Sequence, residues 1–226
     1  MCGRFTNAIT WRELVELYQI HDQPALNLAP RYNIAPGQDI PLCRLAPDRE
    51  PFRREIVQAR WGLVPFWAKD EKIGYKTINA RAETVHEKPS FRAAFRKRRC
   101  LIPADGFYEW KKLEDGSKQP YRICLADGGA FSFAGLWEYN KALDLASCTI
   151  IVTKPNPVIA EIHDRMPVIL APENYDTWLS PDTDPAEVTA LLRPYAGQMT
   201  AYPVSKAVGS ARNDDPGLIE PVEQTT

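Results

Sequence analysis

Residues 106–128, GFYEWKKLEDGSKQPYRICLADG, decide the fold class of this chain. Two runs rich in aromatic and apolar residues are separated by Asp115-Gly116, and the second run ends at Asp127-Gly128. An Asp-Gly pair favours a tight turn because glycine tolerates the positive φ that such turns require. The stretch therefore predicts two antiparallel strands joined by a hairpin. Similar runs, broken by turn signals, continue from about residue 52 onward.

Helices are expected at only a few places. Thr10 followed by Glu13 forms a capping-box pattern, which predicts a helix near residues 11–19. Ser90 opens a short helical pattern, and Asp184-Pro185 starts another. These short segments predict helices that decorate a β-rich body.

The fold class follows from this distribution. Residues 22–42 contain four prolines and should be mostly loop, because each proline fixes its own φ and biases the preceding residue away from helix. Helices and strands do not alternate along the chain, which argues against a βαβ architecture. We expect an α+β fold: one β-rich domain over residues 2–222, with mainly antiparallel strands in a barrel-like core, a few flanking helices and a short tail at 223–226.

The composition excludes several classes of protein. The chain has 226 residues, of which 44% are hydrophobic, so it can bury a sizeable core. Its 28 Lys and Arg residues against 29 Asp and Glu give a net charge of −1, which excludes a generally polycationic binder and leaves local basic patches. No apolar run is long enough to span a membrane, and the first residues lack the pattern of a signal peptide.

The cysteines do not follow the spacing of a metal site. No CxxC pair occurs, so a structural zinc site is not expected. Without an export signal, free thiols in a reducing cytoplasm are expected. Three of the cysteines lie in apolar runs and should act as small core residues: Cys100, Cys124 and Cys148.

Cys2 is the candidate nucleophile, because removal of Met1 would expose it as the first residue of the mature chain. It would then carry an amine and a thiol on adjacent carbons, with reference pKa values of about 7.7–8.0 and 8.5. The amine can condense with an aldehyde to an imine, and the thiol can add to the imine carbon to close a stable thiazolidine. On position alone, a small residue near a buried terminus is the simpler interpretation, so other residues must support this one.

Polar residues embedded in predicted strands and turns supply candidate partners. Asn79 and Arg81 lie two residues apart and would face one side of an extended chain. Glu109 stands between two aromatic residues, a setting that raises the pKa of a carboxylate and suits it to proton transfer. His163 and Arg165 add a titratable group and a fixed cation. Each residue alone is more often structural than functional.

Together these segments resemble the SOS-response-associated peptidase family. The resemblance runs from Cys2 to about Val222, and its motifs occur in the order MCGRF, RYNIAPGQ, WGLVPFW, INARAET, PADGFYEWKK, FAGLWE, IHDRMPVIL and PVSKAV. It implies that Cys2 bonds the aldehyde of an abasic site in single-stranded DNA. It also assigns active-site positions to Asn79, Glu109 and His163.

The chemistry suggests a role for each of these three residues. Asn79 would hold the terminal amine or the substrate oxygen by hydrogen bonds. Glu109 would shuttle protons as the sugar ring opens, and His163 would assist imine formation and its reversal. The division of roles between Glu109 and His163 stays open, because both groups can give and take protons.

The resemblance also implies a path for the DNA strand, which cations and stacking side chains would hold. The positions that contact phosphate are Arg4, Arg81 and Arg165. The positions that form an apolar shelf near the lesion are Pro36, Phe66 and Trp67. Trp61 is better explained as a core residue, and the basic cluster at 96–99 fits either DNA binding or the solvated end of a short helix.

These observations give a definite functional expectation. We expect a DNA-repair enzyme of the SOS response, lyase-like or hydrolase-like, that crosslinks to abasic sites in single-stranded DNA and needs no metal or organic cofactor. It should be a monomer in the bacterial cytoplasm, associated with the nucleoid when bound to DNA and without membrane contact; the replication machinery is a candidate partner. Two alternatives stay open: a thiol autopeptidase that exposes its own Cys2, and a non-covalent reader of modified or single-stranded DNA.

Overall fold

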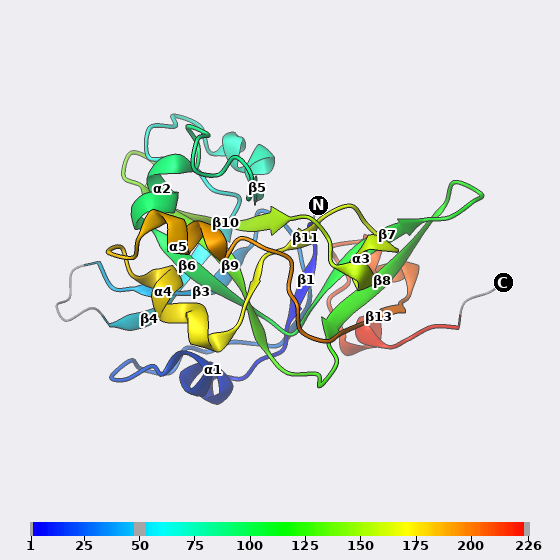
Figure 1. The fold of residues 1–226 in the computed structure, drawn as a ribbon. Helices are drawn as coiled ribbons and strands as arrows, with labels where there is room; N and C mark the ends of the chain where they lie inside the picture. Colours follow the sequence, from blue (N-terminus) through cyan, green and yellow to red (C-terminus); the bar gives the residue numbers. More distant parts are fainter. Residues whose placement is uncertain (1, 48–52, 224–226) are drawn as a thin grey trace.

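The computed structural model describes residues 2–47 and 53–223, and its strands form two sheets (Figure 1). The first sheet contains, in order, β13 (Met199–Pro203), β8 (Lys118–Leu125), β7 (Gly106–Lys112), β1 (Phe5–Asn7) and β2 (Arg31–Ile34). The second contains, in order, β11 (Met166–Pro167), β10 (Leu145–Thr153), β4 (Arg54–Trp61), β3 (Asp39–Leu45), β6 (Arg99–Ala104), β9 (Phe131–Asn140) and β12 (Ile169–Leu170). A further strand, β5 (Asn79–Arg81), pairs with β10.

The second sheet closes on itself. Because β10 pairs with β9 as well as with β4, the strands β10, β4, β3, β6 and β9 form a ring. Most pairings are antiparallel, but β10 runs parallel to both β4 and β5. The prediction of an α+β fold with a barrel-like core of mainly antiparallel strands is confirmed.

Short helices surround this core (Figure 1). The α-helices are α1 (Trp11–Tyr18), α2 (Arg92–Lys97), α3 (Pro157–Ala160), α4 (Tyr175–Leu179) and α5 (Pro185–Ala190). The 3-10 helices are η1 (Glu71–Lys76), η2 (Pro172–Asn174), η3 (Lys206–Gly209) and η4 (Pro216–Ile219). The capping box of Thr10 and Glu13 is present at α1, and Asp184 caps α5, as the sequence predicts.

Residues 22–42 are mostly loop, as the sequence predicts, but they also contain β2 and the first four residues of β3, which the sequence analysis does not predict. Prolines do not prevent this, because Pro41 occupies a strand position where it lies opposite Gln58 of β4. The end of the predicted tail, residues 224–226, lies outside the described residues.

Phe5 anchors the start of the chain between the two sheets. Its ring lies 5.2 Å from that of Trp61 and 5.6 Å from that of Phe133, both in edge-on geometry. All three side chains are buried, and burying one such side chain stabilises the fold by about 2 kcal/mol. Trp61 is therefore the core residue that the sequence analysis expects, and β1 is fixed in place against the barrel.

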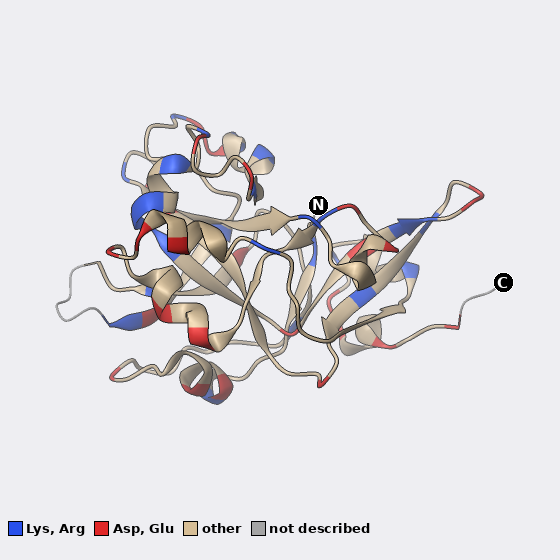
Figure 2. Ribbon diagram, in the orientation of Figure 1, with Lys and Arg blue, Asp and Glu red and all other residues tan. Residues whose placement is uncertain are grey.

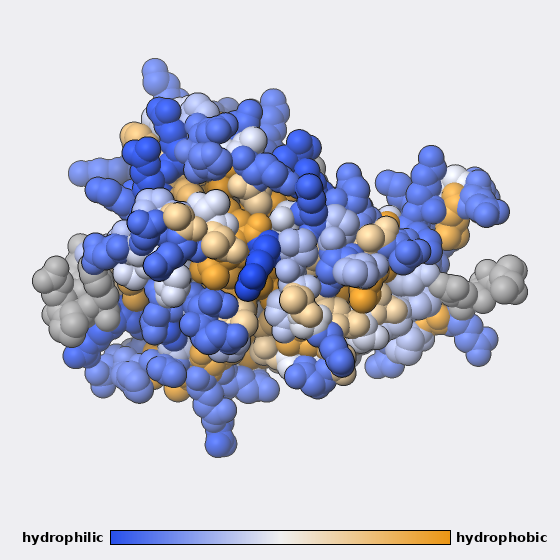
Figure 3. Space-filling model, viewed as in Figure 1, coloured by the Kyte–Doolittle hydropathy of each residue, from blue (hydrophilic) through white to orange (hydrophobic). Residues whose placement is uncertain are grey.

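The visible surface is mainly hydrophilic, with apolar residues gathered near the centre of the face shown in Figure 3. None of the helices in the described part of the chain has the length and hydrophobicity needed to span a bilayer. Within the same residues, no group of three or more His, Cys, Asp or Glu side chains is arranged to hold a metal ion.

Candidate active site

The pairing of β1 with β7 places Cys2 beside Glu109. The two strands run antiparallel, and the pairing continues toward the chain start, where the Tyr108 N–H donates to the Arg4 carbonyl at 2.9 Å. The negative charge of Glu109 acts on the Cys2 thiol and contributes to its raised pKa. The candidate nucleophile and the candidate proton carrier are thus neighbours on paired segments.

Cys2 is fully buried in the chain that retains Met1. Burial raises the pKa of its thiol far above the ordinary range, and Glu109 raises it further, while the positive amino terminus lowers it. Such a thiol is protonated and closed to solvent. The burial that the structural interpretation of Cys2 expects is therefore present, and the thiol must become accessible before it can react with a substrate.

Glu109 is a buried carboxyl group with a pKa close to neutrality. Its exposed fraction is 3%, and burial raises its pKa from 4.5 to about 7. The positive charge of the chain's amino terminus opposes that rise. The aromatic flanks predict this direction, and a carboxyl group with this pKa can both donate and accept a proton near pH 7.

His163 faces Glu109 from a loop after α3, with its Nε2 atom 3.7 Å from the Glu109 Oε2 atom. Its backbone N–H donates to the Ile159 carbonyl at 2.8 Å, so the end of α3 sets its position. The Arg165 N–H donates to Nδ1 at 3.0 Å, which helps to orient the ring with Nε2 toward Glu109. Burial is the main cause of the lowered pKa of His163. The two pKa values therefore shift toward each other.

The central strand β10 carries the remaining predicted residues on its flanks. On one side β5 pairs in parallel with it, with Asn79 beside Ile150 and Arg81 beside Val152. On the other side Pro167 of β11 pairs with the same Val152. The segments that carry Asn79 and Arg81 and the segment that carries His163 and Arg165 are therefore brought to one end of β10.

An ion pair joins these two flanks, because Arg165 Nη1 lies 2.5 Å from Glu83 Oε1. Asn79 contributes an acceptor to the region. Its Nδ2 donates to the Ile78 carbonyl at 3.0 Å, whereas its Oδ1 is buried without a hydrogen-bond partner among the described residues. An amide oxygen in this state is suited to receive an N–H or O–H group from a substrate or a terminal amine.

Comparison with known proteins identifies the family. The model of the SOS response associated peptidase (SRAP) family matches residues 1–211. The chain belongs to the SRAP family. The abasic site processing protein YoqW of Bacillus subtilis is 50% identical to it over 97% of this chain and 99% of its own length. YedK of Escherichia coli, also named an abasic site processing protein, is 31% identical over 98% of this chain and all of its own length.

A solved structure shares the fold of this chain. A protein from Bacteroides thetaiotaomicron aligns with a TM-score of 0.85 and 28% sequence identity, covering 98% of this chain and 100% of that one. The resemblance inferred from the motifs is confirmed by the family model and the relatives.

The phosphate-binding positions predicted from the SRAP resemblance differ in their surroundings. Arg81 is exposed. Arg165 is partly exposed and belongs to the segment on the other side of β10. Arg4 instead donates to the Asn33 side chain at 2.8 Å and to the Val208 carbonyl at 2.7 Å. Arg4 therefore fastens the C-terminal segment of this SRAP chain, and much of its guanidinium is already engaged.

Two residues of the predicted apolar shelf, Phe66 and Trp67, lie in a loop whose shape depends on a close approach of two glycines. A Cβ on Gly62 would lie 2.7 Å from the Gly74 carbonyl oxygen, and Gly62 has a φ of +130° that L side chains rarely adopt. The loop between these glycines presents Phe66 and Trp67, which are 56% and 49% exposed. Two large exposed aromatic side chains in one turn are typical of a binding surface rather than of a core.

One exposed aromatic residue near this shelf is absent from the predictions. Tyr75 is 74% exposed and approaches Gly37, the residue that follows the predicted shelf residue Pro36. Tyr75 lies in the short 3-10 helix η1, where the sequence has no hydrophobic periodicity that would single it out. The only local sign of this residue is an aromatic side chain directly after the glycine of EKIGYK.

The basic cluster at 96–99 is divided between surface and structure. Arg96 and Lys97 occupy the last turn of α2 and are exposed. Arg98 forms an ion pair with the buried Glu138 at 2.7 Å, and Arg99 donates to four backbone carbonyls, including that of Trp178. Half of the cluster therefore stabilises the SRAP fold itself.

Proposed function

We propose that this SRAP protein processes abasic sites in single-stranded DNA by bonding their aldehyde to Cys2 after Met1 is removed. The observation that carries the proposal is the pair formed by Glu109 and His163, 3.7 Å apart, beside the start of the chain. Relatives that match nearly all of this chain are named abasic site processing proteins. The name supports abasic sites as the target, and the geometry supports proton transfer beside Cys2.

Removal of Met1 changes the reactivity of the site in two ways. It transfers the terminal amine to Cys2, so that amine and thiol lie on adjacent carbons. It also removes the residue that directly precedes the buried thiol. A 1,2-aminothiol beside an acid–base pair is then available to an aldehyde that enters from solvent.

Apart from the amine and thiol of Cys2, the proposed reaction needs only groups that transfer protons. The amine nitrogen bonds to the aldehyde carbon, and the carbonyl oxygen leaves as water to give an imine. The sulfur then bonds to the same carbon, and the thiol proton ends on the ring nitrogen, so that a thiazolidine and one water molecule are the products. Glu109, with a pKa of about 7, gives a proton to the departing oxygen and takes one back. His163, whose Nε2 atom lies 3.7 Å from Glu109 Oε2, stabilises the charge that develops on Glu109.

The strand would be held by groups outside this reacting centre. We assign the phosphate contacts to Arg81 and Arg165, which are at least partly exposed at the end of β10. Phe66 and Trp67, with Pro36, would form the surface on which bases near the lesion stack. Arg4 would act on the DNA only through the segment that it fastens.

A denaturing gel tests this function. The protein is incubated with single-stranded DNA that carries one abasic site, and a retarded band that resists denaturant is expected. Cys2→Ala and a chain extended ahead of Cys2 should give no such band. Cys124→Ala, which removes a thiol in β8, should behave as wild type. Equal binding of damaged and undamaged DNA without any covalent band would instead establish a non-covalent reader.

Self-processing is a second candidate activity, because the same acid–base pair lies beside Cys2, the residue that cleavage would expose. Intact-mass measurement of Glu109→Ala tests it. Retention of Met1 in this variant, together with its loss in wild type, would show that Glu109 takes part in exposing Cys2. Loss of Met1 in both proteins would assign its removal to another enzyme.

A further inference from the structure

Glu109 lies in a row of residues that crosses the first sheet, and Tyr121 is its neighbour in that row. The register of β7 and β8 pairs Glu109 directly with Tyr121. Paired residues of an antiparallel sheet point to the same face, with their Cβ atoms about 4.5–5.5 Å apart. Tyr121 is itself buried, with an exposed fraction of 9%. The aromatic side chain and the carboxyl group therefore stand side by side on one face of the sheet.

The aromatic residues that flank Glu109 in the sequence belong to the opposite face of β7. Because side chains alternate along a strand, Tyr108 and Trp110 point away from the side of Glu109. The packing agrees, since Tyr108 belongs to a separate small cluster that includes Val208, and Trp110 packs against that cluster. These neighbours predict the right direction for the pKa of Glu109, but their rings do not cover its carboxyl group.

On the other side of Glu109, the chain start brings a residue without a side chain. The Tyr108 N–H donates to the Arg4 carbonyl at 2.9 Å, which continues the pairing of β1 with β7. One residue further, this register places Gly3 beside Glu109. The side chain that flanks Glu109 within its row is therefore that of Tyr121.

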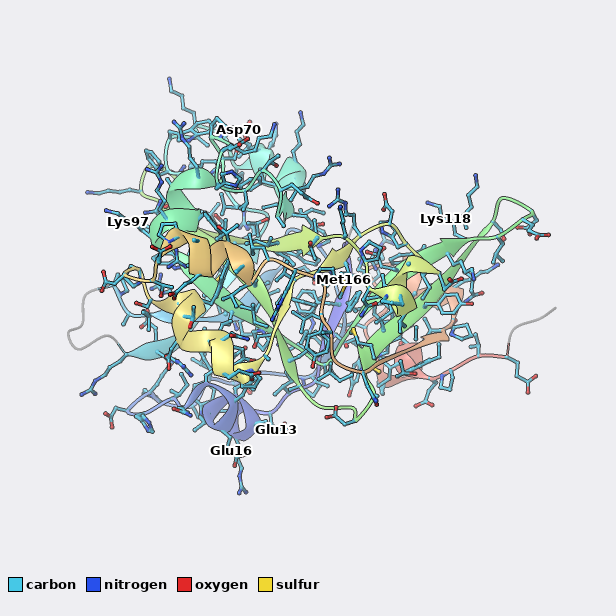
Figure 4. The ribbon with its side chains drawn as sticks, in the orientation of Figure 1. Glu13, Glu16, Asp70, Lys97, Lys118 and Met166 are labelled. Carbon is cyan, nitrogen blue, oxygen red and sulfur yellow. The ribbon has the colours of Figure 1, made fainter. Side chains whose placement is uncertain are left out.

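The same face of the sheet is covered by α3 and the loop that follows it (Figure 1). This helix packs against β13, the strand beside β8, and shares a core cluster with side chains of β7 and β8. The loop after it brings His163 Nε2 to 3.7 Å from Glu109 Oε2. Figure 4 labels two residues that frame this region: Lys118, three residues before Tyr121, and Met166, three residues after His163. Tyr121 and His163 therefore border the same carboxyl group from different elements.

Charges around Glu109 do not account for its raised pKa. The other titratable groups that face it come from β7, the chain start and the loop after α3: Lys111, the amino terminus, Cys2, His163 and Asp164. Burial is the largest cause of the shift, the amino terminus opposes it, and Asp164 adds to it. Figure 2 shows Lys and Arg along the stem of the β7–β8 hairpin and Asp and Glu at its turn. Because a nearby cation lowers the pKa of a carboxyl group, the raised value depends on the exclusion of water.

We propose that Tyr121 is a positioning residue for Glu109: its ring closes the β8 side of the carboxyl group against water. This inference rests on the proposed function, because it assigns Tyr121 to the site where Glu109 transfers protons. A carboxyl group that is kept dry holds its proton at a higher pH than one in water. Tyr121 thus acts on the reaction through Glu109, by setting the pH at which this group can both give and take a proton.

NMR titration of the side-chain carboxyl carbons tests the inference in the full chain without DNA. The Glu109 signal is assigned by its absence from Glu109→Gln. In wild type the pKa of Glu109 should be about 7. Tyr121→Ser admits water and should lower this pKa by about one unit or more, whereas Tyr121→Phe keeps the ring and should titrate as wild type. If Tyr121→Ser does not fold, Tyr121→Gln, which places an amide in the same wall, carries the same expectation.

Trp110→Ser is the matched control, because it removes a ring next to Glu109 in the sequence but on the opposite face of β7. The pKa of Glu109 should stay at the wild-type value in this variant. An unchanged pKa in Tyr121→Ser, or an equal fall in Trp110→Ser, would overturn the proposal. A fall of the same size in Tyr121→Phe would also overturn it, because the ring is retained there.

The pH dependence of crosslinking gives a second measurement, at saturating single-stranded DNA that carries an abasic site. The inflection of the rate in Tyr121→Ser should move by the same interval as the NMR titration, and it should stay in place in Tyr121→Phe. A displaced NMR titration without any crosslink in wild type would refute the covalent function while leaving this inference intact. Crosslinking in wild type, together with an unmoved titration in Tyr121→Ser, would do the reverse.

Discussion

The site consists of two arms with different physical character. The β1–β7 arm, which carries Cys2 and Glu109, is built on paired strands and is almost completely buried. The β10 arm, which carries Asn79, Arg81, His163 and Arg165, is built on short segments at one end of β10 and is partly open to solvent. The buried thiol and carboxyl group lie in the first arm, whereas the second arm carries the two arginines suited to meet a charged ligand, together with Asn79 and His163. The proposed nucleophile and the proposed phosphate ligands are thus on different arms.

The largest effect expected from this separation is on the rate of crosslinking. Glu109→Gln keeps the shape of the side chain but cannot carry a proton, so the rate at saturating DNA should fall by about 10²–10⁴-fold. Arg165→Gln should lower the rate only at limiting DNA, because it weakens binding. Single-turnover gels over a range of DNA concentrations measure both, with the α1 surface variant Glu16→Gln as control. Recovery of Glu109→Gln at high DNA would remove the distinction between the arms.

The buried carboxyl group should also make stability depend on pH. Its folded pKa is raised from 4.5 to about 7, so the stability that it contributes is present at low pH and is lost as pH rises through that interval. The free energy of unfolding of wild type relative to Glu109→Gln should fall by on the order of 2–3 kcal/mol between about pH 4.5 and 7. Urea denaturation at both pH values measures the difference. Parallel behaviour of the two proteins would mean that Glu109 ionises freely in the fold.

The family resemblance assigns Arg4 to phosphate binding, whereas its hydrogen bonds in the structure join it to other parts of the fold. Arg4→Ala removes hydrogen bonds to Asn33, Val208 and Gly209, and it should lower the free energy of unfolding by about 1–3 kcal/mol. The salt dependence of DNA binding should stay as in wild type. Arg81→Ala should show the opposite pattern, with unchanged stability and a shallower salt slope. A shallower slope for Arg4→Ala at unchanged stability would restore Arg4 as a phosphate ligand.

The smallest effect concerns the ion pair between Glu83 and Arg165, at 2.5 Å. The Glu83 carboxylate cancels part of the charge that Arg165 would offer to a phosphate. Glu83→Gln should therefore tighten DNA binding about two- to fivefold, in keeping with an exposed pair worth up to about 1 kcal/mol. Glu87→Gln, in the same loop, is the control. Weaker binding in Glu83→Gln would show that Glu83 instead orients Arg165.

Local signals in the sequence predict much of the fold and part of the site. Asp115-Gly116 marks the β7–β8 hairpin, the Thr10 capping box marks α1, and the aromatic flanks of Glu109 predict the direction of its pKa shift. Each of these depends on residues close together in the chain. The strands within residues 22–42 are hidden because proline content suggests loop, whereas pairing with distant strands decides the outcome.

The remaining features depend on contacts that no local pattern encodes. The convergence of Asn79 and Arg81 with His163 and Arg165 requires β10 between them. The exposure of Tyr75 depends on how η1 packs beside Gly37. A sequence alone can nominate such residues by type, but only the assembled sheet decides which of them become neighbours.

The bonds of Arg4 and Asn33 to the segment around Val208 have a consequence for biogenesis. Arg4 and Val208 are separated by 204 positions, and Asn33 bonds to the same carbonyl as well as to that of Asn213. On the ribosome, the segment that bears Arg4 emerges about 200 residues before the carbonyl groups to which it donates. These hydrogen bonds can therefore form only after the segment around Val208 has been synthesised.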